Sequence, residues 1–276
     1  IIQLCFLILV TAKSARIILW ANDTDTVIIA LSQFNQCSAQ EVWIKVGVGD
    51  QTRFLPIHQI SSTLGSDFCK IAPGLHALTG CDSVSAFFRK GKKLPWRLVK
   101  QKPENYQGIG QLGETDDILS PIITDVEKLV CVLYSNSSVN HPNDVNELRY
   151  RLFCQKKSSS ETLPPTKDSL IQHTKRANYQ TLIWKSSSEA KPAIPEPVGH
   201  GWQKADGKLC PIYGSEDPIP NEAKDFVTCK CKVSKCSTRQ CKCSQNEMAC
   251  TEGCACFNDS SCENVYKFRY SLQVDE

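Results

Sequence analysis

Nine cysteines are concentrated in one segment near the C-terminal end of the chain. The chain of 276 residues contains sixteen cysteines, and nine of them follow the spacing C-x-C-x4-C-x4-C-x-C-x6-C-x3-C-x-C-x5-C. These nine are Cys229, Cys231, Cys236, Cys241, Cys243, Cys250, Cys254, Cys256 and Cys262. The segment is short, polar and poor in large apolar residues, so it cannot bury a core. Either disulfides or thiolate-bound metal must therefore stabilise it.

The number and spacing of these cysteines favour metal over disulfides. Nine is odd, which prevents complete internal pairing, and a disulfide within a C-x-C pair would strain the bridge geometry. Zinc prefers four tetrahedral sulfur ligands at roughly 2.3 Å. Three zinc ions need twelve ligand positions, which the nine thiolates fill if three of them each bridge two metals. The segment therefore predicts a cluster of about three zinc ions.

This cysteine pattern resembles the tesmin/TSO1-like CXC domain, which is also called the CRC domain. The family spacing is met up to Cys256, and Cys262-Glu263-Asn264 supplies the closing C-x-N after a gap of five residues instead of two. The resemblance implies a trinuclear zinc cluster and, as in the tesmin-type members, DNA binding. Those members have a tyrosine before the fourth cysteine that enters the DNA minor groove, whereas this chain has Gln240 there. The resemblance therefore implies zinc binding without that minor-groove contact.

Charge is divided unevenly along the cysteine segment. Its basic residues all precede Glu247, and they are Lys230, Lys232, Lys235, Arg239 and Lys242. From Glu247 to Asn264 the charged residues are all acidic. We expect the basic half to contact DNA phosphates, which gives an affinity that falls steeply with salt and discriminates little between bases.

Three aspartates form a second candidate metal site. Asp23 and Asp25 follow an apolar run, Arg16–Trp20, that predicts a buried strand, and Thr26–Phe34 predicts a helix. In a parallel α/β sheet such a turn lies at the ligand-binding edge, where carboxylates can hold magnesium or manganese. Asp82 follows a glycine turn and is the third candidate. The alternative is that Asp23 or Asp25 caps the following helix.

A basic loop lies a few residues after Asp82. Arg89, Lys90, Lys92 and Lys93 surround Gly91, whose lack of a side chain allows the backbone to approach a phosphate. This composition predicts contact with a DNA backbone. The alternatives are a solvated loop or a nuclear-import signal.

The motifs around these residues resemble a group of transposon-derived animal proteins with a PIN-like fold. The motifs are D-T-D-x-V, P-I-H-x-I and G-L-H-A-L-T-G-C-D-S-x-S-A-F-F-x-K-G-K. Flap endonucleases share this fold, so the resemblance implies that Asp23, Asp25 and Asp82 bind catalytic metal and that Arg89–Lys93 begins a DNA-binding hairpin. Flap endonucleases have further acidic residues upstream, yet residues 1–22 contain no Asp or Glu. We therefore expect weak or absent cleavage; the alternative is a non-catalytic DNA- or chromatin-binding protein with this fold as a scaffold.

Composition along the chain predicts three regions. Residues 1–155 are expected to form an N-terminally incomplete PIN-like α/β domain, with a parallel sheet flanked by helices. Eight of the fourteen prolines lie from Pro164 to Pro220, so 156–222 is predicted to be an extended linker with one helix over Thr166–Trp184. Residues 223–266 are expected to form the zinc-cluster domain, with little regular secondary structure.

The overall charge and the first residues limit the class of protein. The net charge is +3, so only local basic patches would bind nucleic acid. Scattered cysteines suggest a reducing compartment, which together with a DNA partner predicts a nuclear protein. The opening IIQLCFLILV is too short to span a membrane, so we expect no membrane partner. We interpret it as part of a truncated domain; the alternative is a secretory leader on a disulfide-bonded protein.

Overall fold

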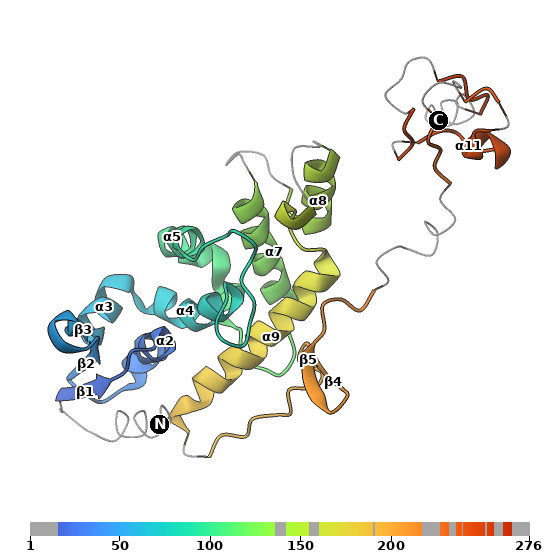
Figure 1. The fold of residues 1–276 in the computed structure, drawn as a ribbon. Coiled ribbons are helices and arrows are strands. Elements are labelled where there is room, and N and C mark those ends of the chain that lie inside the picture. The colour runs from blue at the N-terminus through green and yellow to red at the C-terminus, as the bar shows by residue number, and fades with distance from the viewer. Residues whose placement is uncertain are drawn as a thin grey trace. The chain divides into compact units, whose positions relative to one another are not determined.

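The protein is a mixed α/β chain with a separate cysteine-rich unit (Figure 1). The computed structural model describes residues 16–135, 142–154, 160–189, 191–216, 227–231, 236–238, 240–251, 253–256 and 262–266. The chain divides into two compact units, Ile1–Ser215 and Glu216–Glu276. The predicted apolar opening segment lies outside the described residues.

The described part of the first unit begins with a three-stranded sheet in the order β1-β2-β3. Strand β1 (Arg16–Trp20) pairs in parallel with β2 (Glu41–Val46), and helix α2 (Thr24–Gln33) makes the crossover between them. Strand β3 (Arg53–Pro56) pairs with β2 in the antiparallel sense, so the predicted all-parallel sheet is corrected at this strand. The reason is the short β2–β3 connection, because a parallel crossover needs a dozen or so residues. The backbone turns at Gly47, where φ is +85° and a Cβ atom would lie 2.3 Å from the Gln51 carbonyl oxygen.

The sheet is followed by two consecutive helices, α3 (Ile57–Leu64) and α4 (Ser66–Leu78). The sequence predicts a break in the second helix near Pro73, but α4 continues through it to Leu78. Gly74 is explained by packing, since a Cβ atom there would lie 2.5 Å from the Ile109 carbonyl oxygen. This close approach lets α4 pack against α6 (Gln107–Gly110), and the burial gained offsets the hydrogen bond that the proline cannot make.

Helix α4 is the centre of the core of the first unit. It packs against α2, α6 and a long helix, α9 (Lys167–Lys185), and its inner side chains are fully buried. Among the described residues the unit also contains the α-helices α5 (Lys93–Gln101), α7 (Ser120–Tyr134) and α8 (Val145–Cys154). The apolar spacing of Ile122, Val126, Leu129 and Val130 predicts α7, and all four side chains are buried.

Helix α9 lies in the segment that proline content predicts to be a linker. Leu170, Ala177 and Trp184 belong to the same core as α4, so this helix is an integral part of the first unit. Its buried polar side chains are satisfied: the Thr174 and Thr181 hydroxyls each donate to the carbonyl four residues earlier. The sequence predicts the helix itself over Thr166–Trp184, but these two threonines look solvent-exposed in sequence and are buried in the structure.

The chain after α9 is largely extended and is attached to it by polar contacts. A hairpin forms from β4 (Trp202–Ala205) and β5 (Lys208–Pro211). The buried Arg176 guanidinium of α9 donates from Nη1 to the Gly201 oxygen at 3.1 Å and to the Ile212 oxygen at 2.6 Å. Within the part of the chain that the structure describes, no helix has the length and apolarity needed to cross a bilayer.

Candidate metal centre

Sulfur atoms take the place of an apolar core in the second unit. Its described secondary structure is one short helix, α11 (Lys242–Gln245). The side chains that cluster inside are cysteines with a single valine at the edge: six cysteines are buried and three are half-buried. The buried ones are Cys229, Cys236, Cys241, Cys243, Cys254 and Cys256, and the half-buried ones are Cys231, Cys250 and Cys262.

The sulfur–sulfur distances match the edges of zinc–thiolate tetrahedra. Cys236 Sγ and Cys256 Sγ are 3.4 Å apart, and Cys229 Sγ lies 3.5 Å from Cys256 Sγ and 3.8 Å from Cys250 Sγ. Four sulfurs at roughly 2.3 Å from one zinc would be about 3.8 Å from each other. A disulfide needs about 2.05 Å, and all nine cysteines are free thiols. The spacing therefore fits metal ligands and does not fit bridges.

Three groups of four cysteines can each hold a metal ion. The sulfurs of each group lie within 4.8 Å of one another, and the groups are Cys229-Cys243-Cys250-Cys254, Cys229-Cys236-Cys241-Cys250 and Cys236-Cys250-Cys256-Cys262. Cys229 and Cys236 each belong to two groups and Cys250 to all three. Cys231 completes none of them, although it interacts with Cys236 and Cys241. The cysteine cluster can therefore hold zinc through shared thiolates, which is compatible with a CXC domain.

Polar groups around the cluster orient the sulfurs. Asn264 is buried, and its Nδ2 donates to Cys250 Sγ at 3.1 Å and to the Met248 carbonyl oxygen at 2.9 Å. The backbone N–H groups of Cys229 and Thr251 donate to Cys254 Sγ at 3.5 and 3.4 Å. Hydrogen bonds to a thiolate stabilise its charge and fix its direction toward a metal.

These contacts divide the thiols by acidity. Burial alone would raise the pKa of Cys254, but the two N–H donors lower it to about 7. Burial raises the pKa of Cys243 to about 12 and that of Cys256 to about 11, and it also raises the pKa of Cys236 and Cys250. Most of these thiols therefore stay protonated at neutral pH without metal. Zinc binding must release their protons, which couples metal affinity to pH.

The predicted DNA-binding residues of this unit are only partly described. The side chains of Lys230 and Lys242 are exposed, next to the buried Cys229 and Cys243. Gln240, at the position of the family's minor-groove tyrosine, is also exposed. Lys232, Lys235 and Arg239 lie outside the described residues.

The three predicted catalytic aspartates lie in different surroundings. Asp23 caps α2, since its Oδ1 accepts the Asp25 backbone N–H at 3.0 Å. Asp25 Oδ1 instead lies 2.8 Å from Nε2 of the buried His76, and Asp82 is exposed in a turn. Groups of three or more clustered metal-ligand side chains occur only among cysteines in the described ranges. The magnesium or manganese site at these aspartates stays a prediction.

Asp25, His76 and Lys92 form a hydrogen-bonded chain that sequence analysis does not foresee. Lys92 Nζ lies 2.9 Å from His76 Nδ1 and donates to the His76 carbonyl oxygen at 3.0 Å. Burial lowers the pKa of Lys92. The ring of His76 also packs against Trp96 and Trp184. The one sign of this hydrogen-bonded chain in the sequence is a histidine inside an apolar helix. Its partners could not be identified from sequence, because they lie 51 residues before it and 16 after it.

No family model matches this chain, and no curated protein or solved structure matches it. The resemblances to the CXC domain and to the PIN-like proteins therefore rest on the motifs themselves. Of the two, the CXC resemblance has a structural counterpart, because its cysteines converge on one cluster.

The other three residues of the predicted basic loop lie in different surroundings. Arg89 lies over the ring of Phe88 at 5.1 Å, and Lys90 lies over Tyr134 at 4.7 Å. Burial lowers the pKa of Lys90, whereas Lys93 is exposed at the start of α5. Arg89, Lys90, Lys92 and Lys93 therefore do not share one environment, and Lys92 is the one that bonds to the histidine.

Proposed function

We propose that this chain is a nucleic-acid-associated protein whose second unit is a zinc-cluster domain that binds DNA. The observation that carries the proposal is the set of four-sulfur groups with spacing appropriate to zinc. Zinc would supply the folding free energy of a unit whose described residues cluster around cysteines instead of large apolar side chains. The CXC resemblance adds DNA as the partner. The PIN-like resemblance implies transposon origin, and a DNA partner together with a reducing compartment implies a nuclear protein.

DNA binding would depend on the basic first half of the cluster. Lys230 and Lys242 present exposed ammonium groups beside buried cysteines, so a folded cluster holds their backbone rigidly. Rigid cations bind phosphates with less loss of conformational entropy than a flexible tail does. With Gln240 in place of the tyrosine, the affinity would come from phosphates and would be largely independent of base sequence.

The first unit is proposed to be a PIN-like domain with little or no nuclease activity. A metal ion at Asp25 would have to compete with the hydrogen bond to His76 and with the nearby ammonium of Lys92. Two-metal hydrolysis needs several carboxylates around ions roughly 3.5–4 Å apart. The contacts of Asp23 and Asp25 favour the version of this proposal in which the first unit is a scaffold.

The test measures DNA binding by the zinc-loaded full chain. The zinc-loaded protein is titrated into several labelled duplexes of unrelated sequence at increasing salt. The variant Lys230→Glu/Lys232→Glu/Lys235→Glu should weaken binding to every duplex alike and flatten the salt dependence by about one unit per lost phosphate contact.

The matched control is Lys191→Glu/Lys204→Glu/Lys208→Glu. It changes the net charge equally at exposed lysines of the first unit, and its DNA binding should stay close to wild type. Equal DNA binding by wild type and the cluster variant would show that the basic half of the cluster is not the DNA contact. A strong preference of the wild type for one short sequence would instead show base recognition and contradict the phosphate mechanism.

A further inference from the structure

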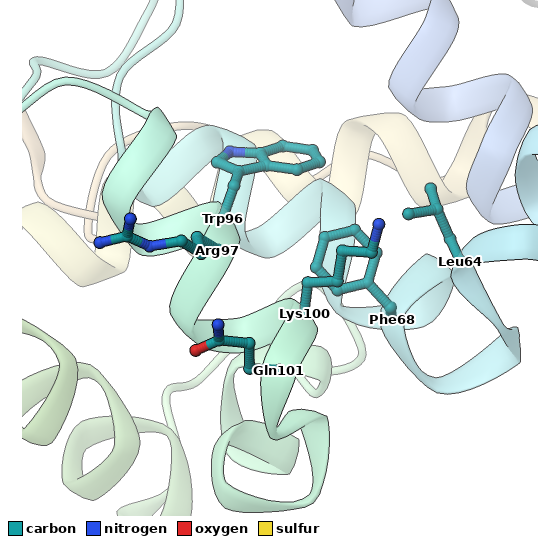
Figure 2. Close-up of a pocket in the computed structure, with 6 residues that line it drawn as sticks. All are labelled: Leu64, Phe68, Trp96, Arg97, Lys100 and Gln101. Carbon is teal, nitrogen blue, oxygen red and sulfur yellow. The ribbon is translucent and has the colours of Figure 1, made fainter.

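A pocket of about 500 Å³ opens on the first unit between α5 and the junction of α3 and α4. Its lining residues come from the end of α3, the first turn of α4 and one face of α5, and they are Leu64, Phe68, Trp96, Arg97, Lys100 and Gln101 (Figure 2). None of the residues described so far as zinc ligands, aspartate candidates or cluster lysines belongs to it. The pocket is therefore independent of the proposed function.

The interior of the pocket is apolar and firmly held. Phe68 is only 2% exposed, and its ring meets that of Trp96 nearly edge-on, with centroids 5.5 Å apart. Leu64 forms the opposite wall as the last residue of α3. These side chains are anchored in the core on one side and border open space on the other. A volume of this size accepts one large apolar side chain or a few small ones.

The α5 side of the pocket rim is positively charged, and the six lining residues include no acidic one, although Asp67 is exposed in the first turn of α4. From Ser83 to Pro103 the chain has basic residues but no acidic ones. Lys93, Arg97 and Lys100 follow the spacing of one helix face, and all three are exposed. None of them makes an ion pair with the described residues. Figure 2 shows Arg97 on the side of α5 away from Leu64, and Lys100 on the side toward it.

We propose that this pocket docks an acidic segment of a partner protein that inserts a large apolar side chain beside Phe68 and Trp96. Carboxylates of that segment would bind Arg97 and Lys100, so apolar burial and charge pairing would act together. An amphipathic helix with acidic residues around one apolar anchor has this chemistry, and it is a recurrent way of filling a groove between helices. The apolar anchor would supply most of the binding energy, and the rim charges would orient it and accelerate association.

DNA fits this surface less well. Phosphates would bind the cations of α5, but a duplex keeps its bases stacked and would leave the apolar pocket empty. An unpaired base needs an open aromatic face to stack on, whereas the Phe68 ring is buried and the Trp96 ring is half-buried. A peptide uses both the apolar interior and the charged rim.

The experiment selects peptides from a random phage-displayed library on the full-length, zinc-loaded chain. Phage that also bind the variant Arg97→Glu/Lys100→Glu are removed first, so that only pocket-dependent peptides remain. We expect the enriched peptides to contain acidic residues around one or two Leu, Phe or Trp residues. A fluorescein-labelled selected peptide should bind the double variant at least about tenfold more weakly, which is roughly 1.4 kcal/mol.

Two further variants separate the apolar contact from the charges. Leu64→Gln should weaken peptide binding while leaving the rim cations in place. Lys204→Glu/Lys208→Glu changes exposed cations of the β4–β5 hairpin and should leave binding unchanged; circular dichroism confirms that every variant is folded. No enrichment, or enriched peptides without acidic residues, would overturn the proposal. The surface would instead be assigned to nucleic acid if the wild type bound no peptide and the Arg97→Glu/Lys100→Glu variant lost duplex binding.

Discussion

His173 should make the first unit sensitive to acid. The side chain lies on α9 inside the core, where Nε2 is 2.8 Å from the Leu78 carbonyl oxygen and the ring packs against Phe87 at 4.9 Å. Burial lowers its pKa from 6.5 to about 4, with the nearby Arg176 adding to the effect. The Leu78 carbonyl favours a protonated Nε2, but one hydrogen bond does not replace the lost hydration of an imidazolium.

The size of the effect follows from the two pKa values. The folded state holds His173 neutral down to about pH 4, whereas the unfolded chain takes up a proton below about pH 6.5. The unfolded state therefore binds more protons in this window, and stability is complete above pH 6.5 and lost as the pH falls toward 4. Each unit of pKa difference corresponds to about 1.36 kcal/mol, so the loss is about 3 kcal/mol.

Urea denaturation of wild type and His173→Gln at a series of pH values measures this loss. Glutamine can still donate to the Leu78 oxygen but does not titrate, so subtracting the two curves cancels the contributions of carboxylates and of acid-induced zinc release. We expect the free energy of unfolding of the wild type to fall by about 3 kcal/mol more than that of the variant between pH 7 and pH 4. His200→Gln, a histidine stacked on Tyr179, is the matched control. Parallel curves for wild type and His173→Gln would refute the argument.

Three further predictions concern the metal sites. The full chain should carry close to three zinc ions by native mass spectrometry. A chelator should abolish the structure of the second unit and leave α4 and α9 intact. A folded, metal-free, disulfide-bonded second unit would contradict this prediction. Asn264→Ala, which removes the donor to Cys250, should weaken zinc binding about 10- to 100-fold in a competition with a chromophoric chelator, and an unchanged affinity would exclude its orienting role. Cleavage of flap DNA with magnesium or manganese should be weak or absent, and strong cleavage abolished by Asp82→Ala would establish a catalytic role for this exposed aspartate.

The local elements around the sites could be predicted from sequence because their signals are local. Strand β1, helix α2 and helix α7 follow from runs and spacings of apolar residues. The predicted burial of β1 is corrected, because only Leu19 is buried there and Ile18 and Trp20 are exposed. The convergence of the nine cysteines could also be predicted, since thiols so close in sequence can meet without help from the rest of the chain. The role of Asn264 was present in the sequence as part of a pattern, but its donation to Cys250 became visible only in the structure.

The surroundings of the remaining residues depend on the tertiary structure. Asp25 looks like a metal ligand in sequence, yet its partner His76 lies on another helix, 51 residues away. The segment around helix α9 looks like a linker in sequence because of its prolines, and the polar Asn178 on the predicted helix does not look buried. In the structure Asn178 Oδ1 accepts the Gly113 N–H at 2.7 Å, and its Nδ2 donates to the Thr115 oxygen at 2.8 Å. A polar residue can be buried only when distant backbone groups satisfy it, and the sequence does not state which groups those will be.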